Sequence, residues 1–464
     1  MPVNSFDDYE LTWKPDKQEL KTPMYRSLAM LMEADIKSGK LIANTKLPPQ
    51  RELADYLDLN HSTITKAYKL CELKGVIHAI VGSGTFVSPN ANSSSSIVNQ
   101  SDTAIADMGM VLPFFNHNKS VKDIVNEVIK KPLSEKLLEY SNPLGSLSQR
   151  IAGAKWVSQF GIDCHANNTI ITAGAQNALA IILLSLFAPG DKIITDPYTY
   201  PNFIALANML HIQLIAVKHD EQGMLPNELD TICSLENIQG IFLMTSCNNP
   251  TTIPLSNHRI RELCFVIKKH QLLVIEDDVF AFMKKNKVTP VCSLLPEQTI
   301  YVSGLSKSIC AGIRVAYMCF PQKYLSRLEQ GCYNVNIKAS SLNVEVVTEI
   351  IQSGLAQKLI QEKYEMAITR NCLYAKYFPS VHCEPESYYQ WLQLPEGYSG
   401  KFFEDLMESK NINVYGAERF SVGDSAKSNA IRIATCSPAT EASLELGLTA
   451  IKKAIKEEIP LSTP

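Results

Sequence analysis

Residues 47–87 read LPPQRELADYLDLNHSTITKAYKLCELKGVIHAIVGSGTFV and carry the clearest local pattern in the chain. Two prolines precede an expected helix over residues 50–57, because proline is tolerated where first-turn amides need no intrahelical acceptor. After the turn 58–60, apolar residues at helical spacing predict a second helix over 61–74, which Gly75 ends. Two short helices joined by a tight turn are typical of a helix-turn-helix unit.

The sequence on either side of this unit completes a small domain. Residues 24–39 carry apolar residues at helical spacing and predict a helix before the unit. After it, residues 76–81 and 85–87 are expected strands around Gly82 and Gly84, which tolerate the positive φ of a tight turn. We expect this hairpin to form a wing.

In the order of its motifs this stretch resembles the winged helix-turn-helix domain of GntR-type bacterial transcription regulators. The LP-x-x-RELA box, the T-hydrophobic-x-x-AY helix and the G-x-GTFV wing follow one another. The resemblance implies that double-stranded operator DNA is the partner, with the second helix of the unit in the major groove and the wing near the minor groove. The residues that it places against DNA are Arg51, His61, Ser62, Thr63, Lys66, Gly82 and Gly84.

A plainer interpretation is that Ser62 and Thr63 only cap a helix and that Arg51 is a solvated charge. The sequence also departs from the family pattern. His61 stands where such regulators often carry arginine, and Asn44 stands where a turn glycine is common. These changes predict weaker DNA binding or a different operator sequence. His61 would add positive charge at mildly acidic pH, because imidazole titrates near neutrality.

The composition of the 464-residue chain is that of a globular protein without a global basic field. Lys and Arg total 44 against 47 Asp and Glu, and residues 1–88 hold 11 basic and 11 acidic residues. DNA binding would therefore depend on where the positive groups lie. An acidic N-terminus and the lack of an apolar run of about 18 residues predict a soluble, cytoplasmic protein with no membrane partner. The 12 cysteines lack paired or ligand-like spacing, which predicts buried thiols and no metal site.

A change of composition divides the chain. Residues 88–103, SPNANSSSSIVNQSDT, are rich in Ser and Asn and have no periodicity that would bury a face. We therefore expect a DNA-binding domain over 1–88, a flexible linker over 89–104 and a large domain over 105–464.

Beyond the linker, strand-like and helix-like segments alternate, which is typical of an α/β sheet covered by helices on both faces. The expected strands are 169–172, 192–195, 212–217, 238–245, 272–276 and 299–303, and the expected helices include 175–187 and 257–270. Ligands in such folds gather at the carboxyl ends of the strands. Polar motifs that follow apolar strands are therefore candidates for a site.

Four motifs follow strands in this way. They are TAGAQNAL (172–179), TSCNNPTT (245–252), LLVIEDDVF (272–280) and YVSGLSKSICAGIRVAY (301–317). The first presents backbone amides at a helix start, where an anion binds well. The third ends a strand with carboxylates able to hold a positive heteroatom. The fourth offers the amine of Lys307, the hydroxyl of Ser306 and the guanidinium of Arg314, a set suited to Schiff-base chemistry beside a phosphate.

This set, in this order, resembles the fold type I aminotransferases, which bind pyridoxal 5'-phosphate, from about residue 140 to the C-terminus. The resemblance implies that Lys307 forms a Schiff base with the cofactor, that Asp277 pairs with the pyridine nitrogen and that Arg432 holds a carboxylate of the substrate or effector. The other implied cofactor positions are Gly174, Ala175, Gln176, Ser306 and Arg314 at the phosphate, Asn249 at the ring oxygen, Tyr200 at the ring face and Tyr140 at the phosphate of a neighbouring subunit. A homodimer is therefore expected.

Each of these residues also has a plainer interpretation, such as a solvated lysine, a strand-end cap or a surface ion pair. Three departures from the family pattern are visible: Phe280 replaces a common tyrosine, Thr252 the glycine of an NPTG turn, and Ala311 a common proline. Loss of the hydroxyl at position 280 should alter the lysine pKa and the rate of exchange between amines. These changes indicate relaxed selection for turnover.

A GntR-type domain linked to an aminotransferase-like domain is the arrangement of MocR-type regulators, which the whole chain resembles. The resemblance implies a transcription regulator whose large domain binds pyridoxal phosphate and senses an amino compound. One alternative is a working aminotransferase that acts on an amino acid. Another is a protein for which the cofactor itself is the signal.

Overall fold

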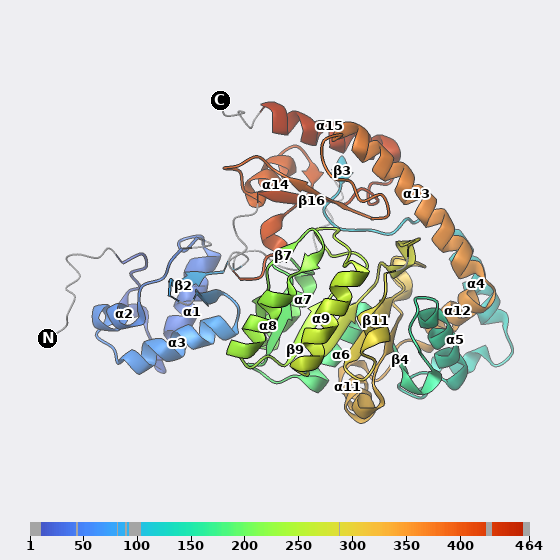
Figure 1. Ribbon diagram of the computed structural model, residues 1–464, viewed down its shortest axis with the longest axis horizontal. Helices are drawn as coiled ribbons and strands as arrows, with labels where there is room; N and C mark the ends of the chain where they lie inside the picture. The colour runs from blue at the N-terminus through green and yellow to red at the C-terminus, as the bar shows by residue number, and fades with distance from the viewer. Residues whose placement is uncertain are drawn as a thin grey trace.

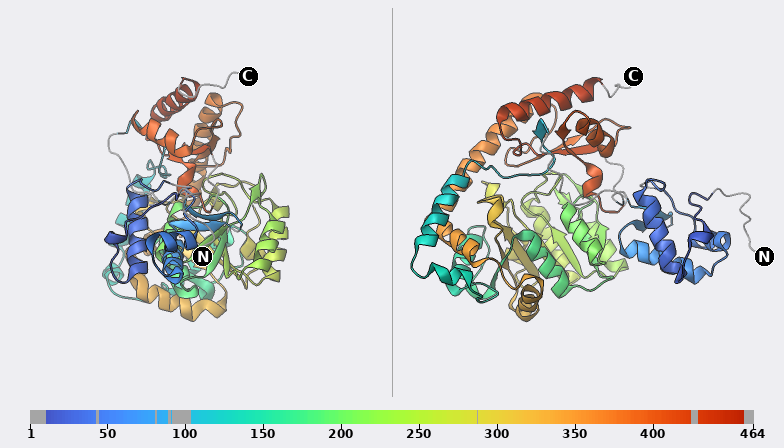
Figure 2. Two further views of the ribbon diagram at one scale, coloured as in Figure 1. Left: turned by 90° about the vertical axis from the view of Figure 1, so that its left-hand side faces the viewer. Right: turned by 180° about the vertical axis from the view of Figure 1, so that it is seen from behind.

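Figure 1 shows the computed structural model, in which a small N-terminal domain lies beside a large α/β domain and a C-terminal domain. The structure describes residues 11–42, 45–80, 82–88, 91, 104–286, 288–423 and 429–457. Asn44 and nearly all of the expected linker over 89–104 lie outside the described residues. In Figure 2 the N-terminal domain projects from one end of the molecule.

The N-terminal domain is a helix-turn-helix followed by a hairpin, as predicted. It contains α1 (Met24–Lys37), α2 (Gln50–Leu57), α3 (His61–Leu73), and the antiparallel strands β1 (Ile77–Ile80) and β2 (Gly84–Val87). The left-handed backbone of Asp58, with φ +48°, ends α2, and the Asn60 side chain caps α3. The apolar faces of the three helices meet in one core, which is why their spacing was visible in the sequence.

The large domain is built on a seven-stranded sheet in the order β4-β12-β11-β10-β9-β5-β6. The strands are β4 (Thr169–Thr172), β5 (Lys192–Thr195), β6 (Gln213–Ala216), β9 (Gly240–Leu243), β10 (Leu273–Asp277), β11 (Thr299–Gly304) and β12 (Ala316–Cys319). Six of them confirm the predicted strands, with differences of one or two residues at some ends. The strand β12 was not predicted from the sequence, and it pairs antiparallel with both β11 and β4.

The reversed direction of β12 matters for the site. The other six strands run in one direction, so their carboxyl ends share one edge of the sheet. Because β12 runs the opposite way, its first residues lie at this same edge, next to the end of β11. Arg314, which precedes β12, is thereby placed near Lys307, which follows β11.

Helices cover both faces of the sheet (Figure 1). One face carries α6 (Ala175–Leu186), α7 (Pro201–Met209) and α11 (Leu325–Asn336). The other face carries α8 (Pro226–Leu235), α9 (Asn257–Lys269), α10 (Val291–Leu294), α5 (Leu147–Ser158) and α12 (Ser341–Gln352). Helix α4 (Asn118–Lys130) packs on α12. The adjacent residues Ile193 and Ile194 of β5 are fully buried in two different clusters. The expected coverage of both faces is confirmed, and it explains why these strands are almost continuously apolar.

The C-terminal part forms a smaller domain that the sequence analysis did not distinguish within 105–464. Its antiparallel sheet contains β13 (Gln390–Gln393), β15 (Tyr415–Gly416) and β16 (Ala430–Ile433). Its helices are α14 (Gly400–Glu408) and α15 (Glu441–Glu457). A separate pair of strands joins β3 (Ala106–Asp107) to β14 (Ile412–Asn413). The long helix α13 (Leu355–Tyr377) runs between the large domain and this one (Figure 1). No helix of the described residues is long and apolar enough to span a membrane.

Candidate functional site

A cavity of about 380 Å³ lies at the carboxyl edge of the sheet, where the predicted motifs meet. The predicted residues that line it are Ala175, Gln176, Tyr200, Asn249, Asp277, Ser306, Lys307, Arg314 and Arg432. Gly174 lies directly against Arg314. Tyr140 does not line the cavity of its own chain, and its side chain is 84% exposed.

The acidic residues at the end of β10 have different environments, because successive strand residues face opposite sides of a sheet. Glu276 is fully buried and accepts hydrogen bonds from the Thr245 hydroxyl, at 2.8 Å, and from two amides at the start of α10. Asp278 accepts hydrogen bonds from the amide and the hydroxyl of Ser246. Both carboxylates are therefore satisfied within the protein, and Asp277 is the one that lines the cavity.

The carboxylate of Asp277 is buried, and its Oδ1 has no hydrogen-bond partner among the described residues. Burial, with a smaller contribution from Asp278, raises the pKa of Asp277 to about 7. Buried polar atoms are nearly always paired, so an unpaired carboxylate oxygen in a cavity indicates a ligand group that carries a proton. A protonated ring nitrogen would satisfy both the hydrogen bond and the charge.

The amine of Lys307 lies in the cavity and donates a hydrogen bond to the backbone oxygen of Val111. Burial lowers the pKa of Lys307 to about 7, and the nearby charges of Arg432, Arg314 and Lys363 act in the same direction. The neutral form of an amine is the one that attacks a carbonyl carbon. The surroundings of Lys307 therefore favour its reactive form near neutral pH.

Arg314, Ser306 and Gly174 form a corner of the cavity that suits an anion. The Nη1 atom of Arg314 donates a hydrogen bond of 2.7 Å to the Ser306 hydroxyl. A Cβ at Gly174 would lie 2.5 Å from Nη2 of Arg314 and would displace the guanidinium, and the φ of +91° at Gly174 is a conformation that favours glycine. Because Gly174 also precedes the first amides of α6, the corner combines a guanidinium, a hydroxyl and a helix N-terminus, which suits a phosphate.

Arg432, in β16, is a buried cation that lines the cavity and is 1% exposed. Its Nη1 donates to Oδ1 of Asn249 at 2.8 Å, and its Nη2 donates to the backbone oxygen of Gly109 at 2.5 Å. The guanidinium also lies 4.7 Å from the centre of the Phe420 ring. Burial lowers the pKa of Arg432 to about 10, so the group stays charged at neutral pH.

Two aromatic residues complete the walls. Tyr200 immediately precedes α7, and burial raises the pKa of Tyr200 to about 12, so its phenol keeps its proton. Phe280 lines the cavity and packs edge-to-face on Tyr388. Because residue 280 is phenylalanine, the cavity has no hydroxyl at that position. Thr252, in the NPTT turn, has φ +65°, a left-handed conformation that favours glycine, so the turn geometry is kept without the family's glycine.

The charged side chains of the cavity correspond to the chemical groups of pyridoxal phosphate. Lys307, Arg314 and Arg432 supply cations, and Asp277 supplies one carboxylate without a full set of partners. These residues fit a ligand that carries an aldehyde, a basic ring nitrogen and a phosphate. The described residues contain no group of three or more His, Cys, Asp or Glu side chains arranged to hold a metal ion.

The buried Asp277 predicts a pH-dependent stability of the protein without cofactor. Its pKa is about 7 in the folded chain against an ordinary 3.8, so between these pH values the folded state binds more protons than the unfolded state. The free energy of unfolding therefore decreases as the pH rises through this range. We expect the melting temperature of the wild type to fall more between pH 5 and 7.5 than that of Asp277→Asn in thermal-shift measurements. If the melting temperatures of the two proteins changed equally with pH, the raised pKa of Asp277 would be contradicted.

The residues predicted to face DNA lie together on the N-terminal domain. Arg51, His61, Ser62 and Lys66 are exposed, and Thr63 is half-buried. The wing glycines Gly82 and Gly84 are also exposed and have φ +79° and +121°. A groove of about 820 Å³ between the start of α2, the start of α3 and the wing is lined by Arg51, His61, Gly82 and Gly84.

The residue that caps α3 decides between the two interpretations of Ser62 and Thr63. The side chain of Asn60 accepts the hydrogen bond from the Ser62 amide at 2.8 Å, and its backbone oxygen accepts from the Thr63 amide. Asn60 therefore caps the helix, and the alternative that Ser62 and Thr63 serve as caps is wrong. Their hydroxyls are not used for capping.

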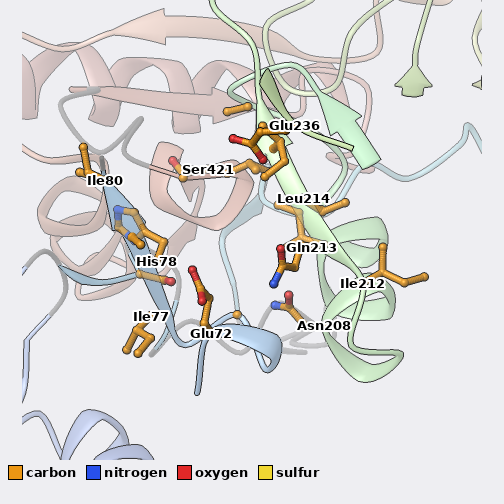
Figure 3. A pocket seen from close by; sticks show the side chains of 18 residues that line it. Glu72, Ile77, His78, Ile80, Asn208, Ile212, Gln213, Leu214, Glu236 and Ser421 are labelled. Carbon is orange, nitrogen blue, oxygen red and sulfur yellow. The ribbon is translucent and has the colours of Figure 1, made fainter. Parts of the chain in front are cut away.

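A crevice of about 360 Å³ separates the N-terminal domain from the large domain (Figure 3). In Figure 3 Glu72 extends toward Asn208 and Gln213 on the opposite wall. The two domains are close here, because a Cβ at Gly75 would collide with Oδ1 of Asn208. Asn208 lies in the last turn of α7, whose first turn follows Tyr200, so one helix connects the cavity to the crevice.

A second segment, residues 420–422, also connects the cavity to the crevice. Phe420 packs on Arg432, and the next residues, Ser421 and Val422, line the crevice. This segment is held to the start of α7, because the Thr199 amide donates to the Phe420 oxygen at 2.9 Å. The arginine of the cavity and the wall of the crevice are thus joined through Phe420, by a ring contact on one side and a backbone hydrogen bond on the other.

Sequence reasoning missed several residues of the site. Gly109 and Val111 contribute backbone oxygens, which any residue supplies, so their types carried no signal. Phe420 is one of 16 phenylalanines and has no motif around it. Lys363, on α13, also went unnoticed; its complete burial is a property of the tertiary structure.

Comparisons with known proteins place both parts of the chain. Residues 111–451 match the family of class I and II aminotransferases, and residues 24–87 match the bacterial regulatory proteins of the gntR family. The chain is 38% identical to the HTH-type transcriptional regulator YdeF of Bacillus subtilis (strain 168), covering 98% of this chain and 100% of the relative. It is 23% identical to the HTH-type transcriptional regulator NorG of Staphylococcus aureus (strain N315), covering 81% and 94%.

Solved structures resemble the large and C-terminal domains. An archaeal alanine:glyoxylate aminotransferase superimposes with a TM-score of 0.71 at 22% identity, over 76% of this chain and 91% of that structure. The α-aminoadipate aminotransferase LysN of Thermus thermophilus gives 0.70 at 18% identity, over 76% and 92%. These likenesses confirm the predicted fold type I aminotransferase architecture.

Fold and site thus define a class of protein, a transcription regulator that joins a DNA-binding helix-turn-helix domain to an aminotransferase-like domain. Within this class, the chain belongs to the GntR family of HTH-type transcriptional regulators with the MocR-type architecture.

Proposed function

We propose that this regulator binds pyridoxal phosphate in the cavity at Lys307 and operator DNA through its N-terminal domain, and that an amino compound or the cofactor itself controls DNA binding in the cytoplasm. One observation carries the proposal. An amine of lowered pKa, a carboxylate oxygen without a partner, an anion-binding corner and a buried arginine surround a single cavity.

Each of these residues has a defined task at the cofactor. When bound, pyridoxal phosphate supplies an aldehyde and a ring that draws electrons from a bonded amine. Lys307 offers the neutral amine for that aldehyde. Asp277 accepts the hydrogen bond of the protonated ring nitrogen, while Arg314, Ser306 and the first amides of α6 neutralise the phosphate. Tyr200, Asn249 and Gln176 shape the remaining walls.

Arg432 suits the carboxylate of an amino acid effector. Its two terminal nitrogens now donate to neutral oxygens of Asn249 and Gly109, so a carboxylate would form a stronger, bidentate pair with the same group. A shift of Arg432 toward such a ligand would also move its contact with Phe420. The segment after Phe420 and helix α7 would transmit the change to the crevice. Only a ligand that binds the two arrangements unequally can change DNA affinity in this way.

A homodimer is also proposed. Large apolar side chains are exposed along residues 129–151, and a second copy of the chain would bury them. They are Ile129, Leu133, Leu138, Tyr140, Leu147 and Ile151. This surface supports the expectation that Tyr140 reaches the phosphate of the neighbouring subunit.

The proposal is tested by titrating DNA binding with both candidate signals. Genome-wide mapping of bound DNA supplies an operator fragment, whose affinity is then measured by fluorescence anisotropy. If an amino compound is the effector, affinity changes when single amino acids are added to protein already loaded with pyridoxal phosphate. If the cofactor is the signal, affinity changes with pyridoxal phosphate alone. An affinity that neither addition changes contradicts the proposed control.

The alternative function is a working aminotransferase, and the presence of Lys307, Asp277 and Arg432 around one cavity favours it as the second candidate. Purified protein mixed with an amino acid and a keto acid discriminates the two functions. Steady multiple turnover supports the enzyme, whereas at most one turnover per bound cofactor supports the regulator.

The groove of the N-terminal domain predicts the effect of Arg51→Ala. The guanidinium of Arg51 is exposed at the start of α2, and one lost charge-assisted contact to a phosphate should weaken operator binding about tenfold. The slope of log affinity against log salt should become shallower by about 1. Arg26→Ala, which removes an exposed arginine from α1, is the matched control and should leave both quantities nearly unchanged. Equal DNA binding by wild type and Arg51→Ala contradicts the assignment.

A further inference from the structure

Lys363 is a second lysine beside the cavity, and no motif in the sequence points to it. It lies on α13, and its side chain is fully buried. Its Nζ donates a hydrogen bond of 2.7 Å to the backbone oxygen of Ile309 and one of 3.1 Å to the backbone oxygen of Lys307. The ammonium of Lys363 thus lies directly behind the backbone that carries the Lys307 amine.

The two acceptors belong to a single turn that follows β11. The amide of Ile309 donates to the oxygen of Leu305 at 2.9 Å, so Lys307 projects from a closed loop. Tyr388 adds a hydroxyl contact to the Lys307 oxygen at 3.4 Å. Because backbone oxygens buried without partners are unfavourable, a donor is needed at this place. Lys363 supplies it from a different element, and α13 is thereby tied to the turn.

A neutral donor would satisfy these oxygens with less desolvation than an ammonium. The charged groups near Lys363 are few. Burial lowers the pKa of Lys363 to about 8, and Cys310 opposes this with a smaller effect. Burial also lowers the pKa of His117; Glu362 opposes this shift and Lys363 adds to it. The described residues form no ion pair with Lys363. The choice of lysine therefore points to a use for the positive charge and not only for the hydrogen bonds.

That use follows from the groups around Lys307. Arg432 and Arg314 lie on the cavity side of the amine, Lys363 lies behind it, and all three disfavour its protonation, while Asp277 is the carboxylate of the cavity. The two arginines would be engaged by the anionic groups of a ligand. Lys363 lies outside the lining of the cavity, so a ligand in the cavity would not engage its ammonium directly.

We propose that Lys363 is a positioning residue for Lys307: its two hydrogen bonds fix the turn from which the Lys307 side chain projects, and its ammonium, held behind that turn, prepares the amine to meet an aldehyde. The inference rests on the proposed function, since it assigns a role to Lys363 in loading the cofactor. It predicts that the hydrogen bonds and the charge of Lys363 contribute separately to the reactivity of Lys307. Three substitutions at position 363 distinguish the two contributions.

The experiment uses the full-length protein without cofactor and measures how fast acetic anhydride labels Lys307 as a function of pH, by peptide mass spectrometry. Lys363→Gln keeps a donor but removes the charge, Lys363→Met removes both, and Lys363→Arg keeps both. We expect labelling of Lys307 at pH 6, below its pKa, to slow about threefold to tenfold in Lys363→Gln and Lys363→Met, which corresponds to a rise of about half a unit to one unit in the Lys307 pKa. Lys363→Arg should retain the wild-type pH profile. Lys358→Met, on the exposed side of the same helix, is the matched control and should also match the wild type.

A second readout is the rate at which added pyridoxal phosphate becomes reducible onto Lys307 by borohydride. It should fall in Lys363→Gln and fall further in Lys363→Met, where the turn is also released. An unchanged pH profile of Lys307 labelling in folded Lys363→Gln overturns the proposed role of the charge. If the wild type captures no pyridoxal phosphate but the labelling shift is present, the proposed cofactor fails while the positioning role of Lys363 stands.

Discussion

Lys307→Ala is expected to abolish covalent retention of pyridoxal phosphate while the chain stays folded. The substitution removes the cavity-lining amine whose surroundings lower its pKa to about 7, and the remaining groups can hold the cofactor only by non-covalent contacts. After dialysis, the wild type should keep about one cofactor per chain with its visible absorbance, and borohydride should fix the added mass on the peptide that contains Lys307. Lys307→Ala should show neither signal.

The matched control is Lys323→Ala, which removes an exposed lysine from the same domain. It should retain the absorbance and the borohydride adduct. The N-terminal domain is a separate core, so DNA binding by Lys307→Ala in the absence of ligand should match that of the wild type. Undiminished absorbance after dialysis of Lys307→Ala would refute the assignment of the lysine.

The second large effect is expected for Asp277→Asn. The amide has nearly the same shape as the carboxylate but cannot carry the negative charge that a protonated ring nitrogen requires. Loss of one partner of a buried ion pair costs about 3–5 kcal/mol, which corresponds to a decrease in cofactor affinity of roughly a hundredfold or more. The decrease is measured by titrating protein with pyridoxal phosphate and following the change in tyrosine and tryptophan fluorescence.

Asp278→Asn is the control for Asp277→Asn, because the two residues are neighbours on the chain and equally buried. Asp278 is already paired with Ser246 inside the protein, so its substitution should lower the melting temperature with only a modest change in cofactor affinity. If both substitutions reduce affinity equally, the ring nitrogen does not meet Asp277.

The N-terminal domain was predictable from sequence nearly residue by residue. Its helices are short and amphipathic, the turn between α2 and α3 is local, and the wing glycines have the positive φ that their positions required. Such features depend on residues close in the chain. The strands of the large domain were predictable for a similar reason, since burial on both faces makes them almost uniformly apolar.

The candidate site was predictable only as a set of motifs. The family resemblance singled out Asp277, and period-two alternation separates it from Glu276 and Asp278, but the strand pattern alone did not show which side of β10 would face a cavity. That choice depends on α10 and on Ser246, which satisfy the other two acids. Likewise, the proximity of Arg314 and Lys307 follows from β12, an antiparallel strand that the sequence pattern did not reveal.

The sequence by itself therefore determined the two kinds of domain, their order and the chemical groups of the site, because helix and strand periodicity and short motifs are encoded by neighbouring residues. The tertiary structure decided which of three acids faces the cavity, how Arg432 is held against Phe420, and that Lys363 lies behind Lys307. These relations join residues separated by up to hundreds of positions, and they exist only when burial of apolar surface has brought the distant elements together.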